Sequence, residues 1–132
     1  MPVFALDDQL IFPHPVLSEP DGLMAIGGDL SVDRLLLAYR WGIFPWYHGD
    51  QPILWWWIAP RLMLRPDAVH ISKSMRTLWR NHKYRISIDE QFTEVMMACR
   101  NIPRLGQDGT WITDDMIQAY TALHLAGYAH SV

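Results

Sequence analysis

The sequence predicts an α+β fold, with a small N-terminal domain over residues 1–60 and the beginning of a second domain over residues 61–132. Two observations favour this organisation. Segments with helical periodicity are interspersed with short β-type runs, and the formal charge changes sign near residue 60. The 132 residues, 50% of them hydrophobic, have room for one ordinary domain or for a small domain and an incomplete second one.

The sequence of the N-terminal part predicts turns over the first 30 residues and a helix after them. The first 30 residues contain four prolines and show no sustained periodicity, so extended segments and turns are expected there. A helix is expected over residues 32–41, because Ser31 can cap its N-terminus and Gly42 can end it.

Two short segments flank this helix. The glycines at 27 and 28 could cradle an anion, but Asp29 lies where an anion would approach, so a tight turn is favoured. Residues 53–58 contain three consecutive tryptophans between aliphatic neighbours. Because successive strand residues face opposite sides, this run predicts a strand buried between two layers.

Two β-type runs and three helices are expected after residue 60. The runs are residues 61–65 and 84–88. The helices are capped by Ser72, Asp89 and Thr113, and a polar loop covers residues 101–109. Each helix has an apolar stripe that is expected to be buried: Met75, Leu78 and Trp79 in the first, Phe92, Val95, Met96 and Cys99 in the second, and Ile117, Tyr120 and Leu123 in the third.

Residues 128–132 read as the start of a further strand. A terminal strand of this length needs partners, and the preceding strands are too few and too short to supply a stable sheet. We therefore expect a fragment whose second domain continues beyond Val132.

The charges are segregated along the chain. Residues 1–60 carry two arginines against seven carboxylates, residues 61–104 carry nine Lys or Arg against four, and the remainder adds three aspartates. The basic middle could steer a polyanion, although on charge alone solvated helix and strand faces are the favoured explanation of such a pattern.

Composition excludes several classes of protein. No apolar run approaches the roughly 20 residues that cross a bilayer, and no basic flank precedes an apolar N-terminus, so neither membrane insertion nor secretion is expected. A single cysteine is compatible with a reducing cytoplasm, which is the expected location. The six histidines are scattered, so no metal site, no cofactor and no Ser/His catalytic pair is expected.

Aromatic residues in loops are the strongest functional feature. Trp46 lies in an aromatic segment just past a helix end, and Trp111 lies in a loop that enters a helix. An indole on a rigid loop can stack on a nucleobase, a sugar or a cation. The alternative for Trp46 is packing at a hinge between two domains, and the residues alone favour neither.

Six separated blocks together resemble bacterial leucyl/phenylalanyl-tRNA-protein transferase. Their order and spacing match over nearly the whole chain, and GIFPW and GTWIT are rare strings. The blocks are GGDLS at 27–31, YRWGIFPW at 39–46, PILWWW at 52–57, HISKS at 70–74, GTWIT at 109–113 and AYTALHLAGYAHSV at 119–132.

The resemblance implies an enzyme that moves Leu or Phe from its tRNA to the α-amine of a protein beginning with Arg or Lys, marking that protein for degradation through the N-degron pathway. It also implies that the second domain is GNAT-like, and that Trp46 and Trp111 hold the aminoacyl-adenosine. The groups thought to assist the amine lie later in the family's sequence, so no catalytic residue is expected in this chain, and residues 1–132 are expected to be inactive alone.

Basic residues of the middle segment are expected to contact tRNA phosphates, which predicts salt-sensitive binding. The candidates are Arg61, Arg65, Lys73, Arg76, Arg80 and Lys83. Two other classes remain open: a tryptophan-rich nucleic-acid-binding module without catalysis, and an inert fragment that packs with a neighbour.

Overall fold

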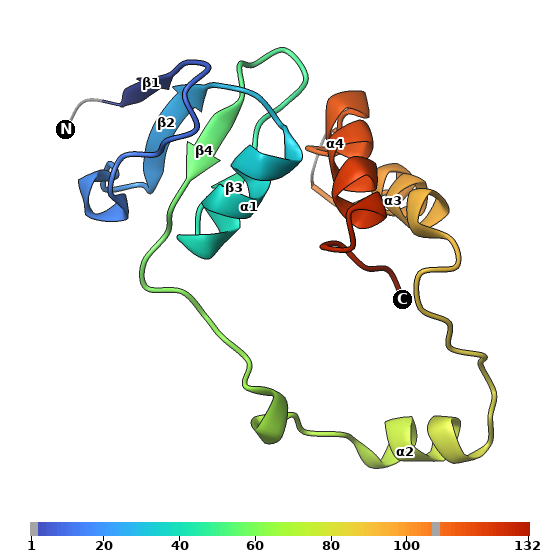
Figure 1. The fold of residues 1–132 in the computed structure, drawn as a ribbon. Coiled ribbons are helices and arrows are strands. Elements are labelled where there is room, and N and C mark those ends of the chain that lie inside the picture. Colours follow the sequence, from blue (N-terminus) through green and yellow to red (C-terminus); the bar gives the residue numbers. More distant parts are fainter. Residues whose placement is uncertain (1–2, 107–108) are drawn as a thin grey trace.

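A four-stranded mixed sheet forms the N-terminal part of the computed structural model, which describes residues 3–106 and 109–132. The strand order is β1-β2-β4-β3, with β1 parallel to β2 and the other pairs antiparallel (Figure 1). The strands are β1 (Phe4–Leu6), β2 (Leu23–Gly27), β3 (Phe44–Pro45) and β4 (Leu54–Trp56).

Helix α1 (Val32–Arg40) covers one face of this sheet (Figure 1). As expected, the Ser31 side chain caps it by accepting a hydrogen bond from the backbone N–H of Arg34. Leu35 and Ala38 on its inner face are fully buried against Met24 and Trp55 of the sheet. Apolar burial on this face therefore fixes α1 to the sheet.

Helices α3 (Phe92–Asn101) and α4 (Asp114–Leu125) pack on the same body (Figure 1). Ala119 and Leu123 of α4 join the buried cluster formed by the sheet and α1. The hydroxyls of Tyr39 and Tyr120 are hydrogen-bonded between α1 and α4, and burial raises the pKa of Tyr120 well above its usual range. One core thus includes residues from both ends of the chain.

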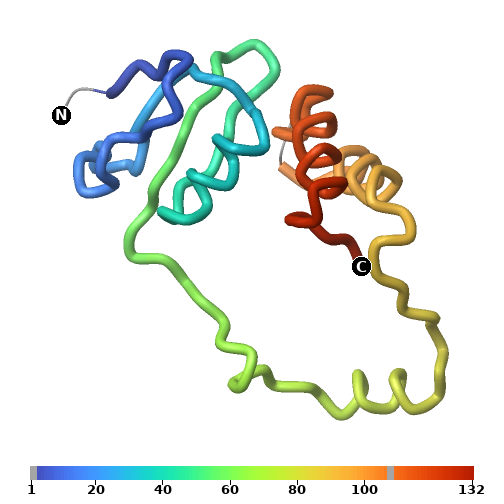
Figure 2. Tube along the Cα trace, in the orientation of Figure 1, coloured from blue at the N-terminus to red at the C-terminus, as the bar shows by residue number. Residues whose placement is uncertain are grey.

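Residues 61–88, here called the arm, leave this body and return to it as an extended path (Figure 2). The arm contains a 3-10 helix (Pro66–Ala68) and helix α2 (Lys73–Arg80), which Ser72 caps as expected. Another 3-10 helix covers Pro15–Leu17 in the N-terminal part. Nearly every arm side chain is exposed, including Leu62 at 100% and Trp79 at 69%. The arm therefore presents its apolar side chains to solvent.

The expected α+β class is confirmed, as are the helices that follow Ser31, Ser72 and Thr113. The three strands expected over residues 61–65, 84–88 and 128–132 are wrong, because none of these segments pairs with another strand of the described chain. Strands β1 and β2 form instead in the proline-containing N-terminal segment. Residues 107–108 lie outside the described residues, so the expected loop over 101–109 is tested only in part.

Several expected burial patterns are also wrong. In the stripe of α2, Met75 and Trp79 are exposed and Leu78 is only half-buried, because no helix or strand of the described chain packs on it. In α3, Phe92 is buried but Cys99 is exposed, since α4 covers only part of the helix. The expected strand over residues 53–58 shortens to β4, in which Trp55 is fully buried while Trp56 is half-buried.

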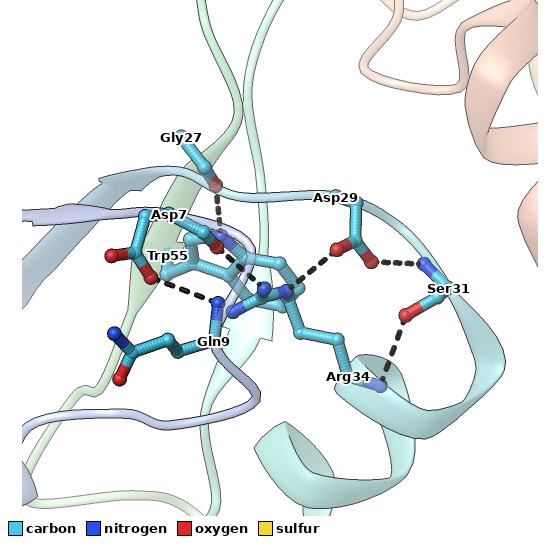
Figure 3. A network of polar contacts seen from close by, with 7 residues as sticks. All are labelled: Asp7, Gln9, Gly27, Asp29, Ser31, Arg34 and Trp55. Atoms are coloured by element: carbon cyan, nitrogen blue, oxygen red, sulfur yellow. Dashed lines mark hydrogen bonds and ion pairs between the residues drawn. The ribbon is translucent and has the colours of Figure 1, made fainter.

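A buried arginine joins the first segments of the chain (Figure 3). The Arg34 side chain is 1% exposed; its Nε donates to Asp29 Oδ2 at 3.2 Å and its Nη2 to the carbonyl of Asp7 at 2.8 Å. Desolvation raises the pKa of Asp29, but hydrogen bonds from Ser31 and the charge of Arg34 outweigh it, and the pKa is lowered overall. The Asp29 carboxylate is thus occupied, since its Oδ1 also accepts from the Ser31 N–H at 2.8 Å. Gly27 and Gly28 have positive φ angles of 88° and 71°, but Gly27 is the last residue of β2, so the tight turn favoured from the sequence is not found at these two glycines.

Replacing Arg34 with Met should lower the free energy of unfolding by about 1.5–3 kcal/mol, the range for hydrogen bonds to charged groups. Chemical denaturation monitored by circular dichroism measures this change. Arg40→Met, on an exposed position of the same helix, is the control and should stay within about 0.5 kcal/mol of the parent. Equal losses in both variants would contradict a structural role for the buried charge.

The C-terminal segment is held by Asp89, which does not cap α3 as expected; Gln91 occupies that position. Asp89 Oδ1 accepts from the Ser131 backbone N–H at 2.9 Å, and Asp89 Oδ2 lies 2.7 Å from His130 Nδ1. These hydrogen bonds hold the pKa of Asp89 below its ordinary value. His124 stacks on Phe92 with a centroid distance of 4.2 Å, so α3, α4 and the last residues meet at one point.

The contact between Asp89 and Ser131 should weaken in acid. The pKa of Asp89 is lower in the folded chain than its ordinary value of about 4, so the carboxylate contributes fully to this contact when the pH is above about 4. The contribution is lost as the pH falls through the lowered pKa. Hydrogen exchange of the Ser131 amide, corrected for its intrinsic pH dependence, measures this loss. Asp89→Asn should remove this pH dependence. If the Ser131 amide of the parent protein kept its full protection at pH values well below the ordinary Asp pKa of about 4, the proposed role of Asp89 would be wrong.

Candidate functional site

Trp46 lies at the end of β3, with its side chain 42% exposed. Its neighbours Pro45 and Tyr47 are buried. Since side chains alternate along an extended chain, burying these two residues turns the ring of Trp46 to the opposite side. The structure therefore presents this indole on the surface, at the end of a strand that the core holds.

Trp111 lies in the loop before α4 and is partly buried. The loop is ordered by local hydrogen bonds: the Thr113 N–H donates to the Trp111 carbonyl at 3.1 Å and the Ile112 N–H to Thr110 Oγ1 at 3.1 Å. Ile112 is buried and anchors the loop beneath Trp111. Trp111 is thus held between a buried residue and a capped helix N-terminus.

The loop that follows Trp46 meets the loop that contains Trp111. A Cβ built on Gly49 would lie 3.9 Å from Thr113 Cγ2, and Gly49 also lines an open cavity at the start of α4. The cavity has a volume of about 390 Å³, and Arg100, Thr110 and Asp115 are among its lining residues. The fold therefore brings the loops that carry Trp46 and Trp111, 65 positions apart in the sequence, to one region. The aromatic ring in contact with Trp46 is that of Trp56.

Two of the candidate basic residues are occupied within the chain. Arg61 Nη2 donates to the carbonyl of Gly42 at 2.9 Å, and its guanidinium lies 5.3 Å from the centroid of Phe44. Arg65 pairs with Asp67 through two hydrogen bonds of 3.1 and 2.6 Å. Both residues remain exposed, but Arg61 also ties the base of the arm to the sheet.

Helix α2 carries its cations along one face. Lys73, Arg76 and Arg80 recur at i, i+3 and i+7, and Arg76 and Arg80 line a surface cavity together with Met75 and Trp79. Within the described part of the chain no carboxylate pairs with these three cations, and Lys83 lies 5.6 Å from the ring of Tyr84. Lys73, Arg76 and Arg80, here called the basic stripe of α2, are therefore positive charges that no carboxylate of the described chain neutralises.

Sequence reasoning missed Trp56 as a member of this region, because the triple tryptophan run was interpreted only as core. Its indole Nε1 donates to the Trp46 carbonyl at 2.7 Å. The alternation within β4 carried the relevant information, since Trp55 and Trp56 must face opposite sides. In residues 3–106 and 109–132, no three His, Cys, Asp or Glu side chains are grouped so that they could bind a metal ion.

None of the described helices has both the length and the apolar character that crossing a bilayer requires.

Comparison with known proteins identifies a class of tRNA-dependent protein transferases. The family model described as leucyl/phenylalanyl-tRNA protein transferase matches residues 63–132, and the model of that family's N-terminal domain matches residues 28–56. The chain belongs to the leucyl/phenylalanyl-tRNA protein transferase family. The resemblance read from the six sequence blocks is therefore confirmed.

Curated relatives cover the chain almost completely. Proteins named leucyl/phenylalanyl-tRNA–protein transferase are 53% identical over 132 residues in Solidesulfovibrio magneticus, 51% over 131 residues in Anaeromyxobacter sp. strain K and 51% over 132 residues in Thermodesulfovibrio yellowstonii. The matches cover 100, 99 and 100% of this chain and 53, 56 and 54% of those proteins. The chain thus spans about half the length of these curated relatives.

Proposed function

We propose that this chain serves the transfer of Leu or Phe from aminoacyl-tRNA to the α-amine of proteins that begin with Arg or Lys, in the cytoplasm, as a mark for degradation. In this proposal residues 1–132 bind the aminoacyl-adenosine and the tRNA. The groups that assist the amine are supplied by the half of the family's length that this chain does not match. The meeting of the Trp46 and Trp111 loops is the single observation on which the binding role rests.

The chemistry requires little from these residues beyond binding. The neutral α-amine attacks the ester carbonyl of the aminoacyl-tRNA, a peptide bond forms, and the bond from the carbonyl carbon to the 3′-oxygen of the terminal ribose breaks. The amine proton passes to a base, and the leaving oxygen takes up a proton to become the ribose hydroxyl. No covalent enzyme intermediate is needed, so orientation of the two substrates is the main contribution of a binding surface. Stacking of the terminal adenine on Trp46, with Trp111 nearby, would provide that orientation.

We further propose that residues 1–60 form the small N-terminal domain and that residues 61–132 begin a GNAT-like domain. The arm supports this division, because its residues 61–65 and 84–88 have the sequence character of strands but no partner in the described chain. Its apolar side chains, which include Leu64 and Ile86, would then pack against the polypeptide that completes the domain.

The basic stripe of α2 is proposed to contact the phosphates of tRNA. Lys73, Arg76 and Arg80 are exposed and share one face, as expected for cations that follow a phosphate backbone. Arg61, Arg65 and Lys83 would contribute less specifically, since each already contacts a group of this chain.

Transfer can be tested by mass spectrometry of an Arg-initiated peptide incubated with Leu-tRNA. A chimaera of residues 1–132 followed by the remaining half of the Solidesulfovibrio magneticus relative should add one leucyl residue, and the 132-residue chain alone should add none. Hydrogen exchange of arm amides should also slow by at least about tenfold in the chimaera, because in this proposal residues 61–65 and 84–88 pair with the added polypeptide and gain hydrogen bonds there.

Reactions with deacylated tRNA serve as the control. A chimaera that leaves the peptide unchanged in the presence of intact Leu-tRNA would overturn the proposed transfer. Transfer by the 132-residue chain would instead show that catalytic groups lie within it, and unchanged arm exchange would contradict the proposed completion of the second domain.

Binding of tRNA should depend on salt through the α2 stripe. Changing Lys73, Arg76 and Arg80 together to Gln should reduce the slope of log K against log salt concentration by about 2, at roughly 0.7–0.9 per phosphate contact. Fluorescence anisotropy of labelled tRNA at several salt concentrations measures this slope. The control Arg40→Gln, at an exposed position of α1, should leave the slope unchanged. An unchanged slope in the triple variant would contradict the phosphate contacts.

A further inference from the structure

The two antiparallel strands β3 and β4 place Trp46 and Trp56 on one face of the sheet. Phe44 is paired with Trp56 and Pro45 with Trp55 in the strand register. Because side chains alternate, Trp55 and Pro45 face the core, while Phe44, Trp46 and Trp56 face away from it. Trp46 is two residues beyond Phe44, and therefore is the diagonal neighbour of Trp56.

Strand β4 holds the backbone of Trp46 at both of its polar groups. The Trp46 N–H donates to the Leu54 carbonyl at 3.0 Å, and the Trp46 carbonyl accepts from the indole Nε1 of Trp56 at 2.7 Å. The first contact continues the ladder of the sheet. The second comes from a side chain, and it fixes the carbonyl where the chain leaves β3 for the loop to Gly49.

The ring of Trp56 also supports the ring of Trp46. Their centroids are 5.8 Å apart with an interplanar angle of 56°, while 42% of the Trp46 side chain stays exposed. The Trp46 ring thus meets another aromatic ring and is still partly open to solvent. An aromatic neighbour at this distance restricts rotation of the indole without covering it.

We propose that Trp56 is a positioning residue that fixes Trp46 for stacking on the adenine of the aminoacyl-tRNA. This inference rests on the proposed function of Trp46. Trp56 contacts no substrate itself: it acts through the carbonyl and the ring of Trp46. An indole that is already fixed loses little conformational freedom when the adenine binds. Because the hydrogen bond from Trp56 fixes the Trp46 indole, the affinity of the chain for the adenine depends on that bond.

A double-mutant cycle between Trp46 and Trp56 tests this role. The probe is the 3′-amide analogue of phenylalanyl-adenosine, in which an amide replaces the reactive ester, and its Kd for the 132-residue chain is measured by calorimetry. Trp46→Ala should weaken binding by about tenfold or more, as expected for losing one stacked base. Trp56→Phe, which keeps a ring but removes the donor, should weaken it by about threefold to tenfold.

The second substitution should have no further effect once Trp46 is absent, because a residue that acts through Trp46 has nothing left to position. A purely structural role would weaken binding equally in both backgrounds. Trp41→Phe makes the same chemical change at an exposed tryptophan, 44% accessible, and should leave the Kd unchanged.

The outcomes separate the two proposals. If Trp46→Ala weakens binding while Trp56→Phe does not, or does so equally without Trp46, the positioning role is wrong and the stacking site stands. If the parent chain fails to bind the probe, or Trp46→Ala binds as the parent does, the stacking site itself is wrong and the positioning role falls with it.

Discussion

The N-terminal body depends on the burial of one positive charge. The Arg34 guanidinium lies between the end of β1, the segment before α1 and the ring of Phe12, whose centroid is 6.0 Å from Arg34 Cζ. A buried cation is tolerated only when its partners are in place. The segments that carry Asp7, Phe12 and Asp29 must therefore assemble together around it.

Local features of the fold could be predicted from the sequence, whereas features that need a partner could not. Ser31, Ser72 and Thr113 cap helices through atoms three residues away, so their effect is present in any context. Residues 61–65 have the composition of a strand, but a strand requires a neighbour to accept its hydrogen bonds. Cys99 shows the same limit for helices, since periodicity identifies a stripe and not the element that covers it.

The candidate site divides in the same way. Trp46 and Trp111 could be selected from the sequence, because indoles outside regular elements are unusual. The contact between Trp46 and Trp56 could not, since it depends on which residue of β3 pairs with which residue of β4. β1 was missed for a related reason: its three residues form a strand only because β2 and Arg34 are beside them.

The shared core has a topological consequence for the arm. Tyr39 and Tyr120 meet although 81 positions separate them, and Leu35 and Leu123 belong to one buried cluster. The arm therefore connects two parts that already adhere without it, and a longer or shorter arm would change the entropy of closing this loop only logarithmically. A protease that cut the exposed arm once would leave a nicked but still associated body, in which α4 stays packed in the shared core and α3 stays packed on α4.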